Sequence, residues 1–366
     1  MIPTCHRLAA RWTFALALCA SAVATSAQEY SIADLGTLPG KDYVYTWELT
    51  LNNAGAVGVY ANTSANPNAF SGDSSYIWHA GRIFPLPPLP GATDTLVTAL
   101  NDRGDAVGIS GADGLLVHGV VWSNGRVRAL DSLPGDDYSF AFDLNNRGQV
   151  VGNSYTAADA QKNGFGGHHA VVWDHGRPRQ LPSLPQGGPD DIAYAINDAG
   201  RIVGQSGPDD GHVHAVVWDS SARGTGITDI GTLGGDASFA IGVGPDGSVV
   251  GGATGADGNF RAFVWNHGML TDLGADGQDV FAEAVSINGR GDCVGISAAS
   301  LTDLTTAKAI LWKHGRMIEL QQHIPAGSGW QLLGGSAINE RGQIAGYGIH
   351  DGKYRAFLLT PVRDDD

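Results

Sequence analysis

The amino-acid sequence predicts an all-β fold, a seven-bladed β-propeller with four antiparallel strands per blade. A short pattern, an apolar residue followed by Asn-x-x-Gly-x-x-x-Gly, occurs seven times in 366 residues, and its turn glycines are 44 to 52 residues apart. Each copy has the composition of two short strands joined by a tight turn. Two further strand-like segments follow each of the first six copies. Four strands at this spacing are typical of propeller blades.

The copies of the pattern define the expected blades. Five are complete, at residues 100–108, 144–152, 196–204, 287–295 and 338–346. The copy at 51–58 is one residue short, and the copy at 243–251 has Gly244 in place of the asparagine. We therefore expect blade hairpins near residues 43–60, 95–110, 138–153, 192–205, 237–252, 280–296 and 331–347.

The unit at residues 138–181 shows the expected blade in full. Strand one is expected at 138–144, strand two at 149–153, strand three at 168–173 and strand four at 177–181, with a variable loop between strands two and three. Trp173 ends strand three and has equivalents in five other units: Trp78, Trp122, Trp218, Trp265 and Trp312. One tryptophan per unit at a fixed strand position predicts packing between blades rather than a ligand platform.

The last unit lacks a fourth strand. After its third strand, at 355–359, the chain ends in a short acidic tail. An unpaired strand-like segment at residues 30–35 precedes the first unit. We predict that it supplies the missing strand, because pairing the two ends closes the ring and leaves no open sheet edge. Residues 28–366 would then form a single propeller domain.

Residues 1–27 have the features of a secretory signal peptide. Arg7 and Arg11 flank an apolar run at residues 12–23, and Thr25-Ser26-Ala27 offers a small-residue cleavage site. The run is too short to span a membrane, which needs about 20 residues. We expect cleavage after Ala27 and a secreted protein, extracellular or periplasmic. The mature chain keeps one cysteine, Cys293, so the fold has no internal disulfide to rest on.

The mature chain is strongly acidic. The full chain has 22 basic and 37 acidic residues, and the signal peptide takes two arginines with it, which leaves a net charge of −17. A protein this acidic, with no basic cluster in its sequence, is not expected to bind nucleic acid. Its charge favours solubility and cation binding.

Three phrases recur in a fixed order. One is Asp-Ile-Gly-Thr-Leu-Gly-Gly at 229–235, with related copies that carry Pro-Gly; the second is the Asn-x-x-Gly pattern. The third occurs at 169–171 and 214–216 as His-Ala-Val, and at 261–263, 308–310 and 355–357 with Arg or Lys for His. These phrases resemble the bacterial HAF repeat of probable extracellular proteins. The resemblance covers residues 30 to 360. It implies export and a repeat fold, and it implies no activity.

No catalytic arrangement stands out in the sequence. There is no Gly-x-Ser-x-Gly elbow, no His-Glu-x-x-His and no phosphate-binding loop. The glutamates inside the repeats, Glu48, Glu283 and Glu319, do not recur as a pair in register, so a glycosidase lacks its two carboxylates. We predict no catalytic residue. The alternative is a propeller enzyme acting on polysaccharide, a lyase or a glycosidase, with residues from several blades meeting at the axis.

An aspartate stands just before strand one in most units, and a basic residue opens strand three. The aspartates are Asp42, Asp94, Asp137, Asp191, Asp236 and Asp279, and the basic residues are His118, His169, His214, Arg261, Lys308 and Arg355. The favoured interpretation is a set of surface hydrogen bonds or ion pairs. The alternative is an acidic channel mouth that binds a hard cation such as Ca²⁺. Trp47 and Trp330 lie outside the tryptophan register and are predicted to be exposed contact residues.

The function expected from the sequence is that of a non-enzymatic binding module without a cofactor. The partner would be an extracellular protein or glycan, bound by the face that carries the long loops between strands two and three. We expect a monomer with no membrane span. A purely structural protein of the cell envelope is a third interpretation that the sequence leaves open.

Overall fold

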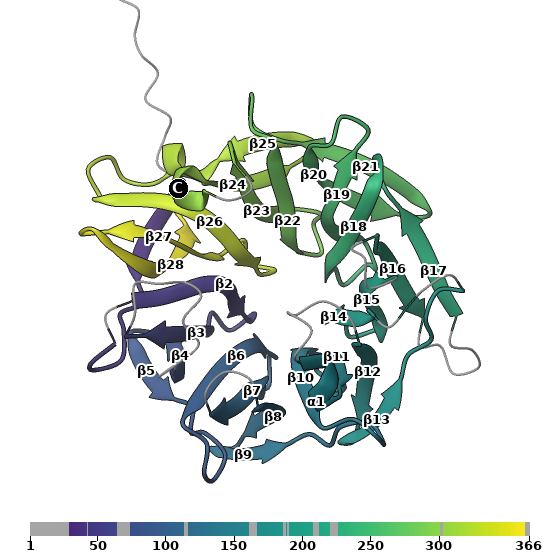
Figure 1. Ribbon diagram of the computed structural model, residues 1–366. Helices are drawn as coiled ribbons and strands as arrows, with labels where there is room; N and C mark the ends of the chain where they lie inside the picture. The colour runs from purple at the N-terminus through teal and green to yellow at the C-terminus, as the bar shows by residue number, and fades with distance from the viewer. Residues whose placement is uncertain are drawn as a thin grey trace, which may run out of the picture.

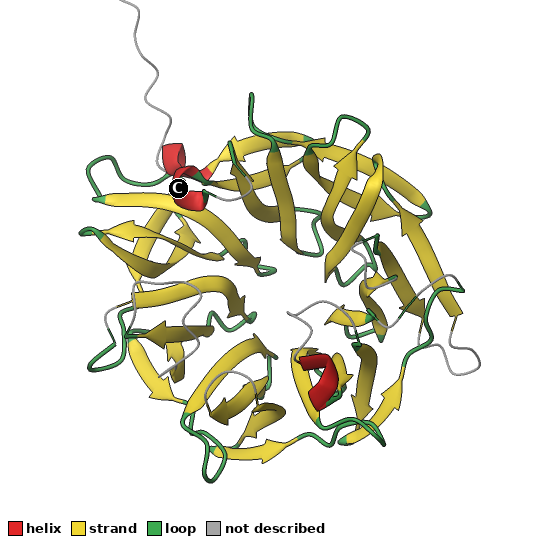
Figure 2. Ribbon diagram, viewed as in Figure 1, coloured by secondary structure: helices red, strands yellow, loops and turns green. Residues whose placement is uncertain are grey.

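The structure is a computed structural model that describes residues 29–41, 43–63, 74–112, 116–160, 167–185, 188, 190–207, 212–219, 226–300 and 303–362. The predicted signal peptide at residues 1–27 and the candidate Asp42 lie outside these residues. In the described residues the chain is β-strand apart from α1 (Ala157–Ala160), the short 3-10 helices η1 (Leu304–Thr306) and η2 (Leu320–His323), and connecting turns and loops. Figure 2 shows strands throughout the ring.

The described strands group into antiparallel four-stranded units, which we number 1 to 7 in chain order. Unit 1 has β2 (Tyr43–Leu51), β3 (Val57–Asn62), β4 (Ser74–His79) and β5 (Arg82–Pro85). Unit 2 has β6 (Asp94–Leu100), β7 (Ala106–Ala112), β8 (Leu116–Ser123) and β9 (Arg126–Ala129). Unit 3 has β10 (Tyr138–Leu144), β11 (Val150–Tyr155), β12 (His169–Asp174) and β13 (Arg177–Gln180).

The second half of the chain repeats this order. Unit 4 has β14 (Ile192–Ile196), β15 (Arg201–Ser206), β16 (His214–Asp219) and β17 (Gly226–Gly231). Unit 5 has β18 (Gly234–Val243), β19 (Val249–Gly255), β20 (Phe260–Asn266) and β21 (Met269–Gly274). Unit 6 has β22 (Phe281–Ile287), β23 (Cys293–Ala298), β24 (Lys308–Lys313) and β25 (Arg316–Glu319). Unit 7 has β26 (Trp330–Ile338), β27 (Ile344–His350), β28 (Lys353–Pro361) and β1 (Tyr30–Asp34).

Across the described residues, hydrogen bonding joins these units into six sheets, five with four strands and one with eight. Units 5 and 6 share the larger sheet through one parallel pair, Phe260 with Phe281. The units stand in a ring with the first strand of each innermost and the fourth outermost (Figure 1). The N-terminal strand β1 pairs with β28 from Tyr30–Pro361 to Asp34–Phe357. The all-β fold, the four-stranded antiparallel order and the closure of the last sheet by the N-terminal strand are therefore confirmed.

The hydrophobic core lies between neighbouring units. Each apolar cluster draws its residues mainly from two adjacent units, as Val107, Leu144 and Trp173 do between units 2 and 3. The strand-three tryptophans Trp122, Trp173, Trp218 and Trp312 are buried. Their indole N–H groups donate to backbone carbonyls that precede their own unit, for example Trp173 to Asp131 at 2.7 Å. The predicted role of these tryptophans in packing between units is confirmed.

The second glycine of the repeated pattern is required by a β-bulge in the facing strand one. In unit 3 the register shifts between Ala141 and Asp143, opposite Gly152. A Cβ on Gly152 would lie 1.9 Å from the carbonyl oxygen of Phe140. The equivalent glycines, Gly108, Gly204, Gly251 and Gly295, have the same contact at 1.8 to 1.9 Å. In these five units the second glycine of the pattern therefore marks a bulge in strand one.

The asparagines of the pattern form a belt of hydrogen bonds around the ring. Each side-chain N–H donates to the backbone carbonyl of the equivalent residue in the next unit: Asn52 to Asn101, Asn101 to Asn145, Asn145 to Asn197, Asn197 to Gly244, Asn288 to Asn339 and Asn339 to Asn52, at 2.9 to 3.3 Å. Each of these asparagines is buried. The belt is open only between units 5 and 6, where Gly244 has no side chain to donate. There the parallel pair and the stacked rings of Phe260 and Phe281, 5.3 Å apart, join the units instead.

The belt predicts that Asn145→Ala is strongly destabilising. The side-chain oxygen of Asn145 accepts the backbone N–H groups of Arg147 and Gln149, both at 3.0 Å, and the side chain is buried. Loss of these bonds leaves polar backbone groups unpaired, which costs about 2–4 kcal/mol of unfolding free energy. Urea unfolding measures the loss. Asn146→Ala, at the partly exposed next position, should cost about 1 kcal/mol. Equal losses in the two variants would contradict a special role for the belt.

Candidate binding site

The bulges direct one side chain per unit to the centre of the ring. These residues are Leu49, Thr98, Phe142, Tyr194, Ile241, Val285 and Ser336, each three positions before the asparagine or its Gly244 replacement. All seven line one cavity of about 270 Å³, together with Glu283, Ile296, Gly335 and Tyr347. The cavity therefore lies on the axis, and every unit contributes to its wall.

The wall combines aromatic, aliphatic and hydroxyl groups. The rings of Phe142 and Tyr194 meet edge to face with centroids 5.3 Å apart. Tyr347, from strand two of unit 7, adds a third ring to the wall. The Thr98 hydroxyl donates to the carbonyl of Ala141 at 2.8 Å, which ties unit 2 to unit 3. Because the seven positions carry different side chains, the chemistry of the wall differs around the axis and has no seven-fold symmetry.

Glu283 is the acidic residue among the described residues that line this cavity. It lies two residues before the bulge of unit 6, is partly buried, and lines the wall near Tyr347. Its carboxyl group has no hydrogen-bond partner within the described part of the chain. Burial raises its pKa from 4.5 to about 7, because no positive group offsets the loss of water. Its charge in turn helps to raise the pKa of Tyr347, although burial is the larger cause there.

A second acid, Asp143, has a raised pKa but a structural role. Its two carboxyl oxygens accept the backbone N–H groups of Leu144 and Ile196, both at 2.8 Å, and so link unit 3 to unit 4. Burial raises its pKa to about 7, and these two hydrogen bonds limit the shift. Asp143 is not among the residues that line the axial cavity. Among the described residues that line the axial cavity, Glu283 is thus the one with a carboxyl group.

The raised pKa of Glu283 predicts a pH-dependent cost in stability. The folded protein holds a proton on Glu283 up to about pH 7, whereas the unfolded chain releases it near pH 4.5. Stability therefore falls as the pH rises through this window, by up to about 3 kcal/mol above pH 7. Glu283→Gln should be the more stable protein at pH 8 and should match the parent at pH 4. Urea unfolding at both pH values checks this, and a difference that does not change with pH would refute it.

A line of hydrogen bonds runs from the axial cavity toward the strand two to strand three loops. The Tyr194 hydroxyl donates to the Gln205 side chain at 2.8 Å, and Gln205 donates to Asp190 at 2.9 Å. The other oxygen of Asp190 lies 2.9 Å from Nδ1 of His168. Tyr155, at the end of β11, contacts His168 edge on, with ring centroids 5.5 Å apart. The cavity wall is thus coupled to polar groups between units 3 and 4.

Three of the predicted aspartates, Asp137, Asp191 and Asp279, make local polar contacts. Asp137 accepts the backbone N–H of Ala157 at 2.7 Å, and Asp191 is buried beside the Ser183 hydroxyl. Burial raises the pKa of Asp191. Asp279 accepts the Ser297 hydroxyl at 2.8 Å and faces Lys308 at 3.2 Å. Asp94 begins β6, and Asp236 is exposed on β18.

No three His, Cys, Asp or Glu side chains converge on a possible metal position within the described residues. The structure therefore offers no support for the Ca²⁺ interpretation. Three basic residues of strand three lie beside acids: His169 beside Asp136 at 3.0 Å, His214 beside Asp229 at 2.9 Å and Lys308 beside Asp276 at 2.6 Å. These three acids are outside the predicted set, and only Lys308, 3.2 Å from Asp279, also reaches a predicted aspartate.

Of the two tryptophans outside the register, only Trp330 has a described side chain. The side chain of Trp47 lies outside the described residues. The prediction that Trp330 is exposed is wrong, because only 8 % of it is accessible. It begins β26, where it pairs with His350 of β27; the two rings stack 4.5 Å apart, and Phe357 packs edge on. These two rings, from β27 and β28, pack against its indole.

Comparison with known proteins supports the fold. The β-propeller domain of the Trilobed protease from Pyrococcus furiosus is similar over 88 % of this chain and 99 % of that domain, with a TM-score of 0.52 and 8 % identity. Oligogalacturonate lyase in complex with manganese is similar over 93 % of this chain and 95 % of the lyase, with a TM-score of 0.52 and 12 % identity. Puromycin hydrolase is similar over 88 % of this chain and 55 % of the hydrolase, with a TM-score of 0.53 and 12 % identity.

At these identities the likeness extends to the fold alone. No family model and no curated protein matches the sequence, so the HAF resemblance stays a prediction. Among the described residues, no helix is long and apolar enough to cross a membrane. The ring of four-stranded units, its closure by β1 and these structural neighbours together identify the chain as a β-propeller.

Proposed function

We propose that the mature protein is a secreted propeller of seven blades, the eight-stranded sheet counting as two, and that it is a non-enzymatic binding module for an extracellular partner. The axial cavity receives a protonated amine of that partner. Such a group is carried by a lysine side chain of a protein or by an amino sugar of a glycan.

The observation that carries this proposal is Glu283 in the axial wall. Its carboxyl group has no hydrogen-bond partner among the described residues, yet it lies in a cavity lined by Phe142, Tyr194 and Tyr347. A cation placed there gains both an ion pair with the carboxylate and attraction to the ring faces. The cavity of about 270 Å³ suits a single side chain or sugar ring. The acidic surface of the mature chain favours the approach of a cationic partner.

The same cavity argues for binding rather than glycoside hydrolysis. Hydrolysis of a glycosidic bond normally uses two carboxyl groups that flank the bond. Glu283 is the one carboxylic acid among the residues that line the axial cavity within the described part of the chain, and Asp143 is held by backbone N–H groups. A single carboxyl group can bind a hydrogen-bond donor such as an amine, but glycoside hydrolysis needs a second carboxyl group.

Thermal unfolding of residues 28–366 at pH 7 with four probes tests the proposal. D-glucosamine and Nα-acetyl-lysinamide carry the amine; D-glucose and Nα-acetyl-norleucinamide are their uncharged counterparts. At 100 times the dissociation constant an amine should stabilise the fold by about 2.7 kcal/mol and raise Tm by several degrees. The amine that gives the larger shift indicates whether the partner is a glycan or a protein.

Two variants make the result specific to the cavity. Glu283→Gln should abolish the shift caused by the amine. Glu319→Gln, which removes a carboxyl group from β25 outside the cavity, should leave it unchanged. An amine that gives no shift in the parent, or the same shift in Glu283→Gln, would refute the axial site.

A further inference from the structure

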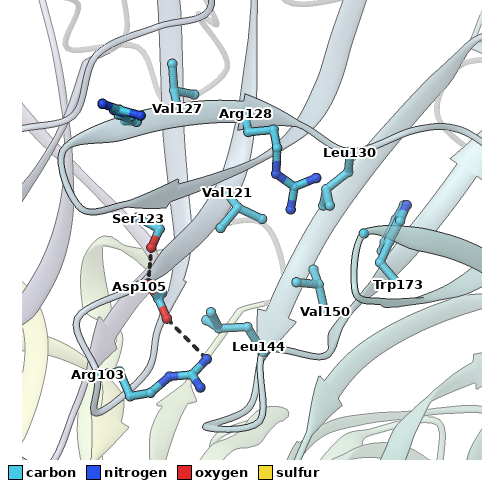
Figure 3. A pocket seen from close by; sticks show the side chains of 13 residues that line it. Arg103, Asp105, Val121, Ser123, Val127, Arg128, Leu130, Leu144, Val150 and Trp173 are labelled. Carbon is cyan, nitrogen blue, oxygen red and sulfur yellow. Dashed lines mark hydrogen bonds and ion pairs between the residues drawn. The ribbon is translucent and has the colours of Figure 1, made fainter.

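A second cavity lies between units 2 and 3, away from the axis. Its volume is about 570 Å³, and it is half open to solvent. The wall from unit 2 carries Arg103, Arg126 and Arg128, with Asp105 and Ser123 between them. Figure 3 shows the side chains of Arg103 and Arg128 on opposite sides of the space, with Val121 and Leu144 between them. We refer to this space as the arginine groove.

The arginine groove holds an excess of positive charge. Arg103 pairs with Asp105 at 3.2 Å, and Asp105 also accepts the Ser123 hydroxyl. Arg126 and Arg128 are exposed on β9, and their side chains have no ion-pair or hydrogen-bond partner among the described residues. Three arginines therefore face one aspartate in a protein whose total charge is strongly negative. Such a local inversion of charge attracts anions.

The repeat provides an internal comparison. The equivalent groove between units 4 and 5 also contains an arginine, Arg201. There Asp219 occupies the position of Ser123, one residue after the strand-three tryptophan, and it accepts Arg201 Nε at 3.0 Å. Arg201 also donates to the carbonyl of Gly247 at 3.0 Å. The groove between units 4 and 5 thus has one arginine and two aspartates in its lining, whereas the arginine groove has three arginines and one aspartate.

Protection of an exposed sheet edge is the simpler role for arginines on an outer strand. Arg177 and Arg179 of β13 are exposed at the equivalent positions of unit 3 and serve as the example. They line none of the cavities described above. Edge protection explains why β9 carries exposed charge. It does not explain why these arginines line a cavity, or why Ser123 stands where unit 4 has Asp219. Substitution of Arg177 and Arg179 is therefore a matched control for substitution of Arg126 and Arg128.

We propose that the arginine groove binds a sugar acid, either free or as one unit of an acidic glycan. Arginine side chains bind carboxylates through paired, charge-assisted hydrogen bonds. Asp105 and Ser123 place acceptors beside the arginines, and sugar hydroxyl groups can donate to them. The half-open space is large enough for one or two sugar rings. This site is independent of Glu283 and of the axial cavity.

Saturation-transfer NMR and ligand titration with three probes test the proposal. D-glucuronate is the sugar acid, its methyl ester is the neutral counterpart, and acetate has the charge without the hydroxyl groups. Glucuronate should bind the parent protein at least tenfold more tightly than either control. Its binding should weaken as NaCl is raised, because salt screens exposed charges.

Arg126→Gln combined with Arg128→Gln should lower the affinity for glucuronate at least tenfold. Arg177→Gln combined with Arg179→Gln should leave it unchanged, and circular dichroism should show that both variants are folded. Glu283→Gln should retain glucuronate binding, which separates this site from the axial one. Equal binding of glucuronate and its ester, equal losses in the two double variants, or no detectable binding of glucuronate would overturn the proposal.

Discussion

Removal of the N-terminal strand should abolish a stable fold. A chain of residues 36–366 lacks β1, which forms a five-residue ladder with β28. It also loses Tyr30 and Leu35, which are 6 % and 1 % exposed in the complete protein. Two buried side chains and a ladder of hydrogen bonds together contribute on the order of 5 kcal/mol or more. That is comparable with the whole stability of a typical domain. Thermal unfolding should show a weak or absent transition.

A peptide of residues 29–38, added to the truncated chain, should restore the transition. The free edge of β28 presents unpaired backbone groups to which a strand can add. The same peptide with Leu35→Asp serves as the control, because Leu35 is buried in the cluster between units 7 and 1. If the truncated chain unfolds at the temperature of the parent, or if both peptides restore it equally, the N-terminal strand does not close the ring.

Gly152→Ala should be among the most damaging single substitutions. The added methyl group would lie 1.9 Å from the carbonyl oxygen of Phe140, so the two strands would have to separate. Main-chain displacement of this kind costs about 3 kcal/mol or more. Gly226→Ala is the control, because a Cβ there meets nothing within 4 Å. Urea unfolding should show a large loss for Gly152→Ala and a change within about 0.5 kcal/mol for Gly226→Ala.

The effect should extend to the axial site. Gly152 pairs with Ala141, next to the bulge that directs Phe142 into the cavity. A strand that shifts to admit the methyl group moves this ring and its edge contact with Tyr194. Equal stability of Gly152→Ala and Gly226→Ala would mean that the bulge is not the reason for the repeated glycine.

Most of the fold was predictable because each unit repeats the same short-range sequence features. The expected hairpin at residues 138–153 corresponds to β10 and β11, which run over Tyr138–Leu144 and Val150–Tyr155. The segment expected at 30–35 corresponds to β1, Tyr30–Asp34. Strand alternation, turn residues and the position of Trp173 all act within a few residues of one another. Such local rules can be read from sequence.

The candidate site was not predicted, because it depends on a departure from those rules. The alternation of inward and outward side chains along a regular strand does not predict that Phe142 and Tyr194 face the axis. The bulge in each strand shifts the register by one residue. The sequence does hold a usable signal. The position three residues before the asparagine carries a different residue type in each of the seven units, whereas its surroundings repeat. Glu283 lies outside that position, and Trp330 is packed against His350 and Phe357, which are distant in the sequence. Neither is fixed by local pattern.

The most direct test of the axial site is the titration of Glu283 itself. The sequence contains five glutamates, so ¹³C labelling of their carboxyl carbons gives a simple NMR spectrum, and Glu283→Gln identifies the signal. Without a ligand, Glu283 should titrate with a pKa of about 7. With Nα-acetyl-lysinamide or glucosamine its pKa should fall, because a bound cation favours the carboxylate. A pKa near 4.5, or one that neither amine changes, would contradict a cation-binding axial site.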